Sequence, residues 1–173
     1  LIVCAENGSV TATYNNDGTF DADDAGTYVL HTGSSNFLGT VLEVNATGTF
    51  TYIPSWQTNT TYYISYVIGN EISGSVDLTD PCLGVAPGQP VIFRADPIIV
   101  FNPVVDTCGL ANVISVNPET GVLYTWSTTN PNVTLTSPNG NSTQVTVTNP
   151  GSYEVILTAN NDVCSSTSNL TLN

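Results

Sequence analysis

The side chains of this chain that could do chemistry are few: four cysteines, a single histidine and a cluster of aspartates. Nucleophilic catalysis requires a general base beside a Ser, Cys or Thr, and His31 is the only histidine that could serve as one. His31 alternates with Tyr28 and Leu30 along GTYVLHT, so its side chain is expected to point away from theirs. We therefore interpret His31 as a surface or packing residue, and the sequence predicts no catalytic site.

The cysteines are Cys4, Cys82, Cys108 and Cys164, and no two of them have CxxC spacing. With one histidine in the chain, they do not form a set of zinc ligands. Disulfides are the favoured interpretation, and they imply an oxidising compartment outside the cytoplasm. The alternative is four buried free cysteines, because Cys often acts as a small hydrophobic residue.

The segment NNDGTFDADDAG is the one candidate metal feature, with the aspartates Asp17, Asp21, Asp23 and Asp24. Loops rich in Asp and Asn oxygens suit calcium. Read from Asp21, the segment has Gly26 where a calcium-binding EF-hand loop needs glycine. Its fifth and twelfth positions are Ala25 and Thr32, so this motif fails. We expect a solvated acidic loop and no cofactor, with bound calcium as the alternative.

The charge of the chain excludes whole classes of partner. Arg94 is the only Lys or Arg against 14 Asp and Glu, which gives a formal net charge of -13. Nucleic acid is excluded because phosphate backbones need basic side chains, and an anionic membrane surface would repel the chain. No apolar stretch approaches the roughly 20 residues of a membrane span, so we expect no direct membrane insertion.

Apolar residues alternate with polar ones between Gly, Asn, Asp and Pro turns, and no segment has helical spacing. This pattern predicts an all-β protein. In the first half we expect strands at residues 9–14, 26–32, 39–45, 48–54, 60–68 and 73–79. Tyr62 and Ile64 line one face of the fifth segment while Tyr63 and Ser65 line the other, which is typical of a strand near a sheet centre.

The second half has an immunoglobulin-like signature. Cys108 precedes the strand ANVISV, Trp126 lies in LYTWS, and QVTVT follows. Tyr153 then opens a strand in which Val155 and Leu157 share its face. Trp126 falls where such a domain has a core tryptophan, whereas Trp56, in PSWQTNT, is interpreted as lying in a loop.

Sandwich domains of this kind need about 80 to 100 residues, so the chain is expected to hold two. We assign residues 90–95 to the last strand of the first domain and residues 97–102 to the first strand of the second. The prediction is two tandem immunoglobulin-like β-sandwich domains, residues 1–96 and 97–173, joined end to end by a short linker.

Each predicted domain has a cysteine near both of its ends. Of the three connectivities, only Cys4 with Cys82 and Cys108 with Cys164 leaves the domains unlinked, and we expect this pairing if each half folds alone. Closing loops of this length stabilises a domain by about 4 kcal/mol in the chain-entropy model.

The segments GTYVLHTGSSNFLGTVLEVNATGTFTY, NTTYYISYVIGN and VDLTDPCLGVAPGQPVIFR resemble a repeat of very large surface and secreted proteins of Bacteroidota, including gliding-motility adhesins. The part from Cys108 to Leu172, with YTWS, GSYEVILTANN and the trailing Cys164, resembles the PKD-like or immunoglobulin-like repeats that accompany it. The resemblance implies an extracellular location and export by the type IX secretion system through a separate C-terminal signal domain.

We therefore expect a non-enzymatic structural or adhesion segment of a large cell-surface or secreted protein, acting as a stalk spacer or fibre-building module. Its expected partners are neighbouring repeats or copies of itself, with surface glycans or other cell-surface proteins as further candidates. The alternative is a carbohydrate-binding accessory module of a secreted hydrolase, which an exposed platform of Trp and Tyr would support.

Overall fold

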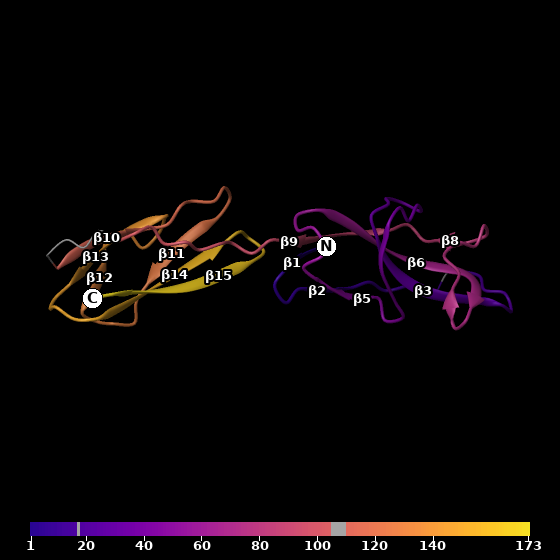
Figure 1. Cartoon of the computed structure of the whole chain (residues 1–173), viewed down its shortest axis with the longest axis horizontal. Helices are drawn as coiled ribbons and strands as arrows, with labels where there is room; N and C mark the ends of the chain where they lie inside the picture. Colours follow the sequence, from indigo (N-terminus) through magenta and orange to yellow (C-terminus); the bar gives the residue numbers. More distant parts are fainter. Residues whose placement is uncertain (17, 105–109) are drawn as a thin grey trace. The chain divides into compact units, whose positions relative to one another are not determined.

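The computed structural model describes residues 1–16, 18–104 and 110–173. All regular elements in these ranges are β-strands, which confirms the all-β prediction. The chain divides into two compact units, Leu1–Ala95 and Asp96–Asn173 (Figure 1). This division lies one residue before the predicted boundary between residues 96 and 97. Within the described ranges, no helix has the length and apolarity needed to cross a membrane.

The first unit is built on one large sheet and one strand pair. Its strands are β1 (Ile2–Cys4), β2 (Ser9–Thr11), β3 (Asp24–His31), β4 (Val41–Asn45), β5 (Thr49–Thr51), β6 (Thr61–Ile72), β7 (Ser75–Val76), β8 (Gly84–Val85) and β9 (Gln89–Arg94). The large sheet has the order β1-β9-β6-β3-β4, with β7 and β8 also paired to β6, while β2 and β5 form the separate pair. The pairing of β1 with β9 is parallel.

The central strand β6 is covered on both faces, as its alternation predicts. Tyr62 and Ile64 belong to a core cluster with Phe50 of β5 and Phe93 of β9. Val67 belongs to a second cluster with residues of β3 and β7. Because burying a large apolar side chain stabilises the fold by about 1.5–3 kcal/mol, these two layers hold β3 and β6 in place.

The second unit is a sandwich of two three-stranded sheets. Its strands are β10 (Ala111–Ser115), β11 (Leu123–Ser127), β12 (Val133–Leu135), β13 (Ser142–Val147), β14 (Tyr153–Asn160) and β15 (Ser165–Leu172). One sheet has the order β10-β13-β12 and the other β11-β14-β15. The inward side chains of both sheets form one core cluster that includes Ile114, Val145 and Leu157.

Two aromatic residues fix the immunoglobulin-like character of this unit. Trp126 is 2% exposed, and its indole Nε1 donates a hydrogen bond to the Gly140 carbonyl at 2.8 Å. Tyr153, at the start of β14, donates from its hydroxyl to the Asn149 carbonyl four residues upstream. That bond has the form of the tyrosine corner of immunoglobulin-like sandwiches. The predicted core role of Trp126 is confirmed.

The predicted strand at residues 97–102 is wrong. This segment makes only an isolated bridge between Phe101 and Val116. Pro97 is its first residue and Pro103 follows it, and proline has no N–H to donate to a ladder. The segment still alternates, because Ile99 and Phe101 pack against the core of the second unit.

Candidate functional site

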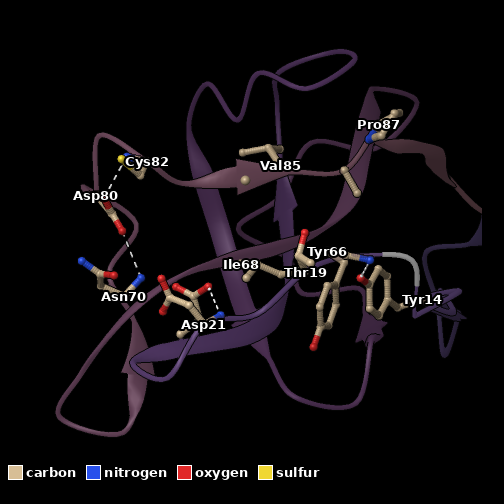
Figure 2. A pocket seen from close by; sticks show the side chains of 14 residues that line it. Tyr14, Thr19, Asp21, Tyr66, Ile68, Asn70, Asp80, Cys82, Val85 and Pro87 are labelled. Atoms are coloured by element: carbon tan, nitrogen blue, oxygen red, sulfur yellow. Dashed lines mark hydrogen bonds between the residues drawn. The ribbon is translucent and has the colours of Figure 1, made fainter.

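The first unit contains a pocket of about 610 Å³, a volume typical of small-molecule sites. Three segments build it: the loop that precedes β3, the C-terminal half of β6, and the stretch that runs through β8. The lining residues that carry its chemistry are Tyr14, Asp21, Asp24, Tyr66, Asp80 and Cys82. Figure 2 shows the carboxylates toward one end and the two tyrosines toward the other.

The acidic end is anchored by Asp80. One carboxylate oxygen of Asp80 accepts a hydrogen bond from the backbone N–H of Asn70 at 3.0 Å, and the other accepts from that of Cys82 at 2.8 Å (Figure 2). These bonds favour the charged form and lower the pKa of Asp80. Asp80 is therefore a fixed anion at the pocket wall.

The loop before β3 adds further negative charge. The Asp21 backbone N–H donates to the Asp24 carboxylate at 3.0 Å, and the Asp23 N–H donates to the Asp21 carboxylate at 3.3 Å. A side-chain hydrogen bond with Asp23 is the main cause that raises the pKa of Asp21, and repulsion from the Asp23 and Asp80 carboxylates acts in the same direction. No basic side chain lines the described pocket.

This geometry does not assemble the calcium site considered from the sequence. Of the four loop aspartates, Asp17 lies outside the described residues. In the described part of the chain, Asp21, Asp23 and Asp24 do not form a group whose ligand atoms all lie within 4.8 Å of one another. Calcium takes six to eight oxygen ligands in close array, so these side chains fit it poorly. The absence of a cofactor stays a prediction.

The aromatic end is made by tyrosines that contact one another. The rings of Tyr14 and Tyr66 stack with centroids 4.0 Å apart, and Tyr28 meets Tyr66 edge-on at 4.9 Å. The Tyr28 hydroxyl also accepts a hydrogen bond from the Tyr14 backbone N–H at 3.0 Å. Burial raises the pKa of Tyr66, so its phenol stays neutral near pH 7 and offers no base.

The only histidine lies in the core, as the packing interpretation requires. His31 Nε2 and Ser65 Oγ are 2.9 Å apart, the separation of a nucleophile and its base. Both residues are almost completely buried, with 0% and 1% of their surfaces exposed. Burial lowers the pKa of His31, although the carbonyls of Leu38 and Gly33 act in the opposite direction. Since no substrate can reach Ser65, the pair is structural.

The predicted disulfide between Cys4 and Cys82 is wrong, because Cys82 is an exposed free thiol. Cys4 pairs with Arg94 of β9, next to the N-terminal end of β6. Cys82 follows a turn near the other end of β6, where the Asp80 carboxylate accepts a hydrogen bond from the Asn70 backbone N–H. At about 3.3 Å per residue these positions are roughly 30 Å apart, far more than a disulfide allows.

The disulfide chemistry itself is confirmed, because Cys4 and Cys164 are both disulfide-bonded. The other predicted pair, Cys108 with Cys164, involves a residue that lies outside the described ranges.

Both tryptophans are buried, although Trp56 lies in the loop between β5 and β6, as the sequence predicts. Trp56 is 6% exposed and packs in the first unit with Phe93 and Tyr52, whose ring centroids lie 5.4 and 6.3 Å from its own. Trp126 is buried in the second unit. Neither indole can therefore form an exposed platform for a sugar ring.

The pocket residues Tyr66 and Asp80 were missed by sequence reasoning. Alternation placed Tyr66 on a strand but not beside Tyr14, and Asp80 opens the segment DPCLGVAPGQP, whose proline and glycine indicate only a turn. The sequence signal closest to them is the acidic loop, because two of its aspartates line the same pocket as Tyr66 and Asp80.

Comparison with known protein families gives a match that covers the end of the first unit and all of the second. The model of the PKD domain family matches residues 79–173, which is more than half of the chain. The match begins in the first unit, ahead of β8 and β9, and continues to the last residue of the second unit. No curated protein matches the chain.

Proposed function

Because the chain belongs to the PKD domain family, we propose that it is a non-enzymatic, extracellular structural and adhesion segment of a larger surface or secreted protein. The match over residues 79–173 is the observation that carries the proposal. PKD domains are typically extracellular, non-catalytic modules, and the disulfide-bonded Cys4 and Cys164 are consistent with that environment.

The chemistry of the first unit supports a non-catalytic role. Its single histidine is sealed in the core, and the Tyr66 phenol at the pocket stays protonated. Asp80 is a carboxylate locked on two backbone N–H groups, which makes it a poor proton acceptor. These residues can position a ligand, but they do not supply an accessible base.

Within the structural role, the segment serves as a stalk spacer or as a fibre-building module. The resemblance to repeats of Bacteroidota surface proteins favours export by the type IX secretion system as the route to the cell surface. Neighbouring repeats and other copies of this chain are the proposed partners. The net charge of -13 favours solubility and keeps isolated copies apart at low ionic strength.

A carbohydrate-binding accessory module is the second candidate, and the pocket is the observation that favours it. Sugars bind where aromatic rings adjoin polar side chains, and the pocket has the Tyr14–Tyr66 pair beside Asp21 and Asp24. With both tryptophans buried, this pocket rather than a flat surface would hold the sugar.

The two candidates are separated by testing the purified chain against a panel of soluble polysaccharides for binding and for hydrolysis. The structural role requires no binding in the pocket and predicts no hydrolysis, and hydrolysis would overturn it. Binding that Asp21→Asn abolishes would favour the carbohydrate module, provided that the matched variant Asp162→Asn, at an exposed turn of the second unit, still binds. Binding that both variants keep would place the sugar away from the pocket.

A further inference from the structure

In the part of the second unit that the structure describes, one long strand has no partner along one of its edges. β15 pairs with β14 through eight successive residue pairs, from Tyr153 with Leu172 to Asn160 with Ser165. Among the described residues, no strand pairs with its other side. Backbone N–H and C=O groups alternate in direction along a strand, so about half of the residues in β15 present theirs to the open side. Such a row is a template for another strand.

The other strand edges of this unit are covered or short. Beside β11, the Trp126 N–H donates to the Pro138 carbonyl at 2.7 Å, and the Gly140 N–H donates to the Tyr124 carbonyl at 3.0 Å. β10 has five residues, and at its end the Asn102 N–H donates to the Ser115 carbonyl at 2.8 Å while Phe101 bridges to Val116. β12 has only three residues. The open edge of β15 is therefore a particular feature of this strand.

β15 also lacks the devices that keep strand edges apart. Its sequence, SSTSNLTL, has no charged residue, proline or glycine, and its pairing with β14 has no bulge. The nearest carboxylate along the ladder, Glu154 on β14, accepts a hydrogen bond from the Asn169 amide at 2.8 Å. In a chain of net charge -13, this neutral edge is where two copies can meet with the least repulsion.

We propose that β15 pairs antiparallel with β15 of a second copy about a two-fold axis at Ser168. The pairing rests on the proposed structural role and names its partner surface. Directly opposed residues of antiparallel strands share a face, so Thr167 of one copy lies opposite Asn169 of the other, and Ser165 lies opposite Thr171. An axis at Asn169 would overlap as many residues of β15 but would leave Ser165 unopposed, whereas the axis at Ser168 gives all four exposed side chains of this face a partner.

The side chains on this face are suited to such pairing. Ser165, Thr167, Asn169 and Thr171 are all exposed, and all can both donate and accept hydrogen bonds. Threonine pairs across strands already occur in this chain, where the Thr11 and Thr49 hydroxyls are 2.8 Å apart on β2 and β5. Polar cross-strand pairs of this kind stabilise a sheet.

A two-fold contact uses the same surface on both copies and is complete with two, so this edge produces pairs and not fibres. Salt strengthens the pairing because it screens the repulsion between two strongly negative chains. A fibre would require a second, different contact surface.

Sedimentation equilibrium of the parent chain and its variants tests the pairing, with the salt raised to about 0.5 M to screen the net charge. The parent is expected to form dimers. The double variant Thr167→Lys, Asn169→Lys places lysines opposite one another and is expected to weaken dimerisation on the order of tenfold. The matched control Gln144→Lys, Thr146→Lys adds the same charge to exposed positions of the central strand β13 and is expected to dimerise at least as well as the parent.

A charge-paired variant tests the register. Thr167→Lys combined with Asn169→Glu leaves the net charge unchanged and places each lysine opposite a glutamate only if the axis lies at Ser168. It is expected to dimerise, because the axis at Ser168 brings opposite charges together. An axis at residue 167 would place two lysines opposite one another, and an axis at residue 169 would place two glutamates opposite one another. Circular dichroism verifies that each variant keeps its fold.

A parent that stays monomeric at every salt concentration would overturn the pairing, as would a dimer that the double lysine variant leaves unchanged. Either result leaves the non-enzymatic role standing, since that role fails only if the chain shows catalysis or is not extracellular. A parent dimer that the charge-paired variant loses would refute the axis at Ser168.

Discussion

Acid should destabilise the first unit through His31. Its side chain is fully buried, Nε2 is 2.9 Å from Ser65 Oγ, and no described group makes a well-formed hydrogen bond to Nδ1, although the Leu38 and Gly33 carbonyls lie near enough to favour the charged ring. Burial lowers its pKa below the usual 6.5, whereas in the unfolded chain it titrates at the usual value. Between the two pKa values the unfolded chain binds more protons than the folded one, so stability decreases as the pH falls.

The size of the effect follows from the linkage between proton binding and folding. One proton taken up only by the unfolded chain changes the free energy of unfolding by about 1.4 kcal/mol per pH unit. Lowering the pH from about 7 to about 5.5 should therefore cost up to about 1 kcal/mol, the limit in which folded His31 takes up no proton over this interval. Free carboxylates titrate mostly below about pH 5 and free thiols above about pH 8. Because the pKa of Asp21 is raised, a variant without the histidine is needed to isolate its contribution.

The assay is urea unfolding followed by the fluorescence of Trp56, in a Trp126→Phe background so that the signal reports the first unit alone. His31→Gln serves as the control, because glutamine can keep a hydrogen bond to Ser65 and does not titrate. The difference between the two proteins in free energy of unfolding should change with pH, in the direction of a less stable parent at low pH and by up to about 1 kcal/mol over this interval. Equal pH dependence in both would refute the account of His31 as a buried, neutral side chain.

Three further results are expected. Iodoacetamide should modify Cys82 in the folded protein, because this thiol is free and exposed. Non-reducing peptide mapping should recover Cys4 and Cys164 only in disulfide-linked peptides, and a peptide that joins Cys4 to Cys82 would contradict the structure. Trp126→Ala should lower the free energy of unfolding by roughly 3 to 5 kcal/mol, as measured by urea denaturation, and an unchanged stability would show that the indole is not in the core. Calcium titration calorimetry should show no saturable binding, because the described carboxylates of the acidic loop do not converge; saturable binding that Asp24→Asn abolishes would show otherwise.

Local alternation was sufficient to predict the strands that carry the cores. The spacing of Tyr153, Val155 and Leu157 placed these side chains on one face, and all three are buried. Likewise, the apolar residues on both faces of β6 predicted its central position. These predictions succeed because a strand exposes alternate residues to opposite sides, a rule that depends only on neighbours in the sequence.

Features set by long-range pairing could not be predicted in this way. The partner of Cys4 depends on the parallel pairing of β1 with β9, which places it far from Cys82. The pocket depends on the approach of Tyr14 and Asp80 to β6, and neither position carries a local signal for the other. Cysteine spacing and turn composition do not determine such contacts, because several strand topologies are compatible with the same local pattern.

The resemblance to large surface proteins was more informative about the second unit than about the first. The signature around Trp126 led to the sandwich, and the PKD match covers that unit completely. The first unit has a parallel edge strand and an acidic pocket that the signature did not indicate.

The proposed extracellular structural role is tested most directly by immunogold electron microscopy of intact source cells, with antibodies raised against this chain. The proposal predicts gold particles on material that projects from the cell surface or is released from it, before any permeabilisation. Labelling that appears only after permeabilisation and is confined to the cytoplasm would contradict the account.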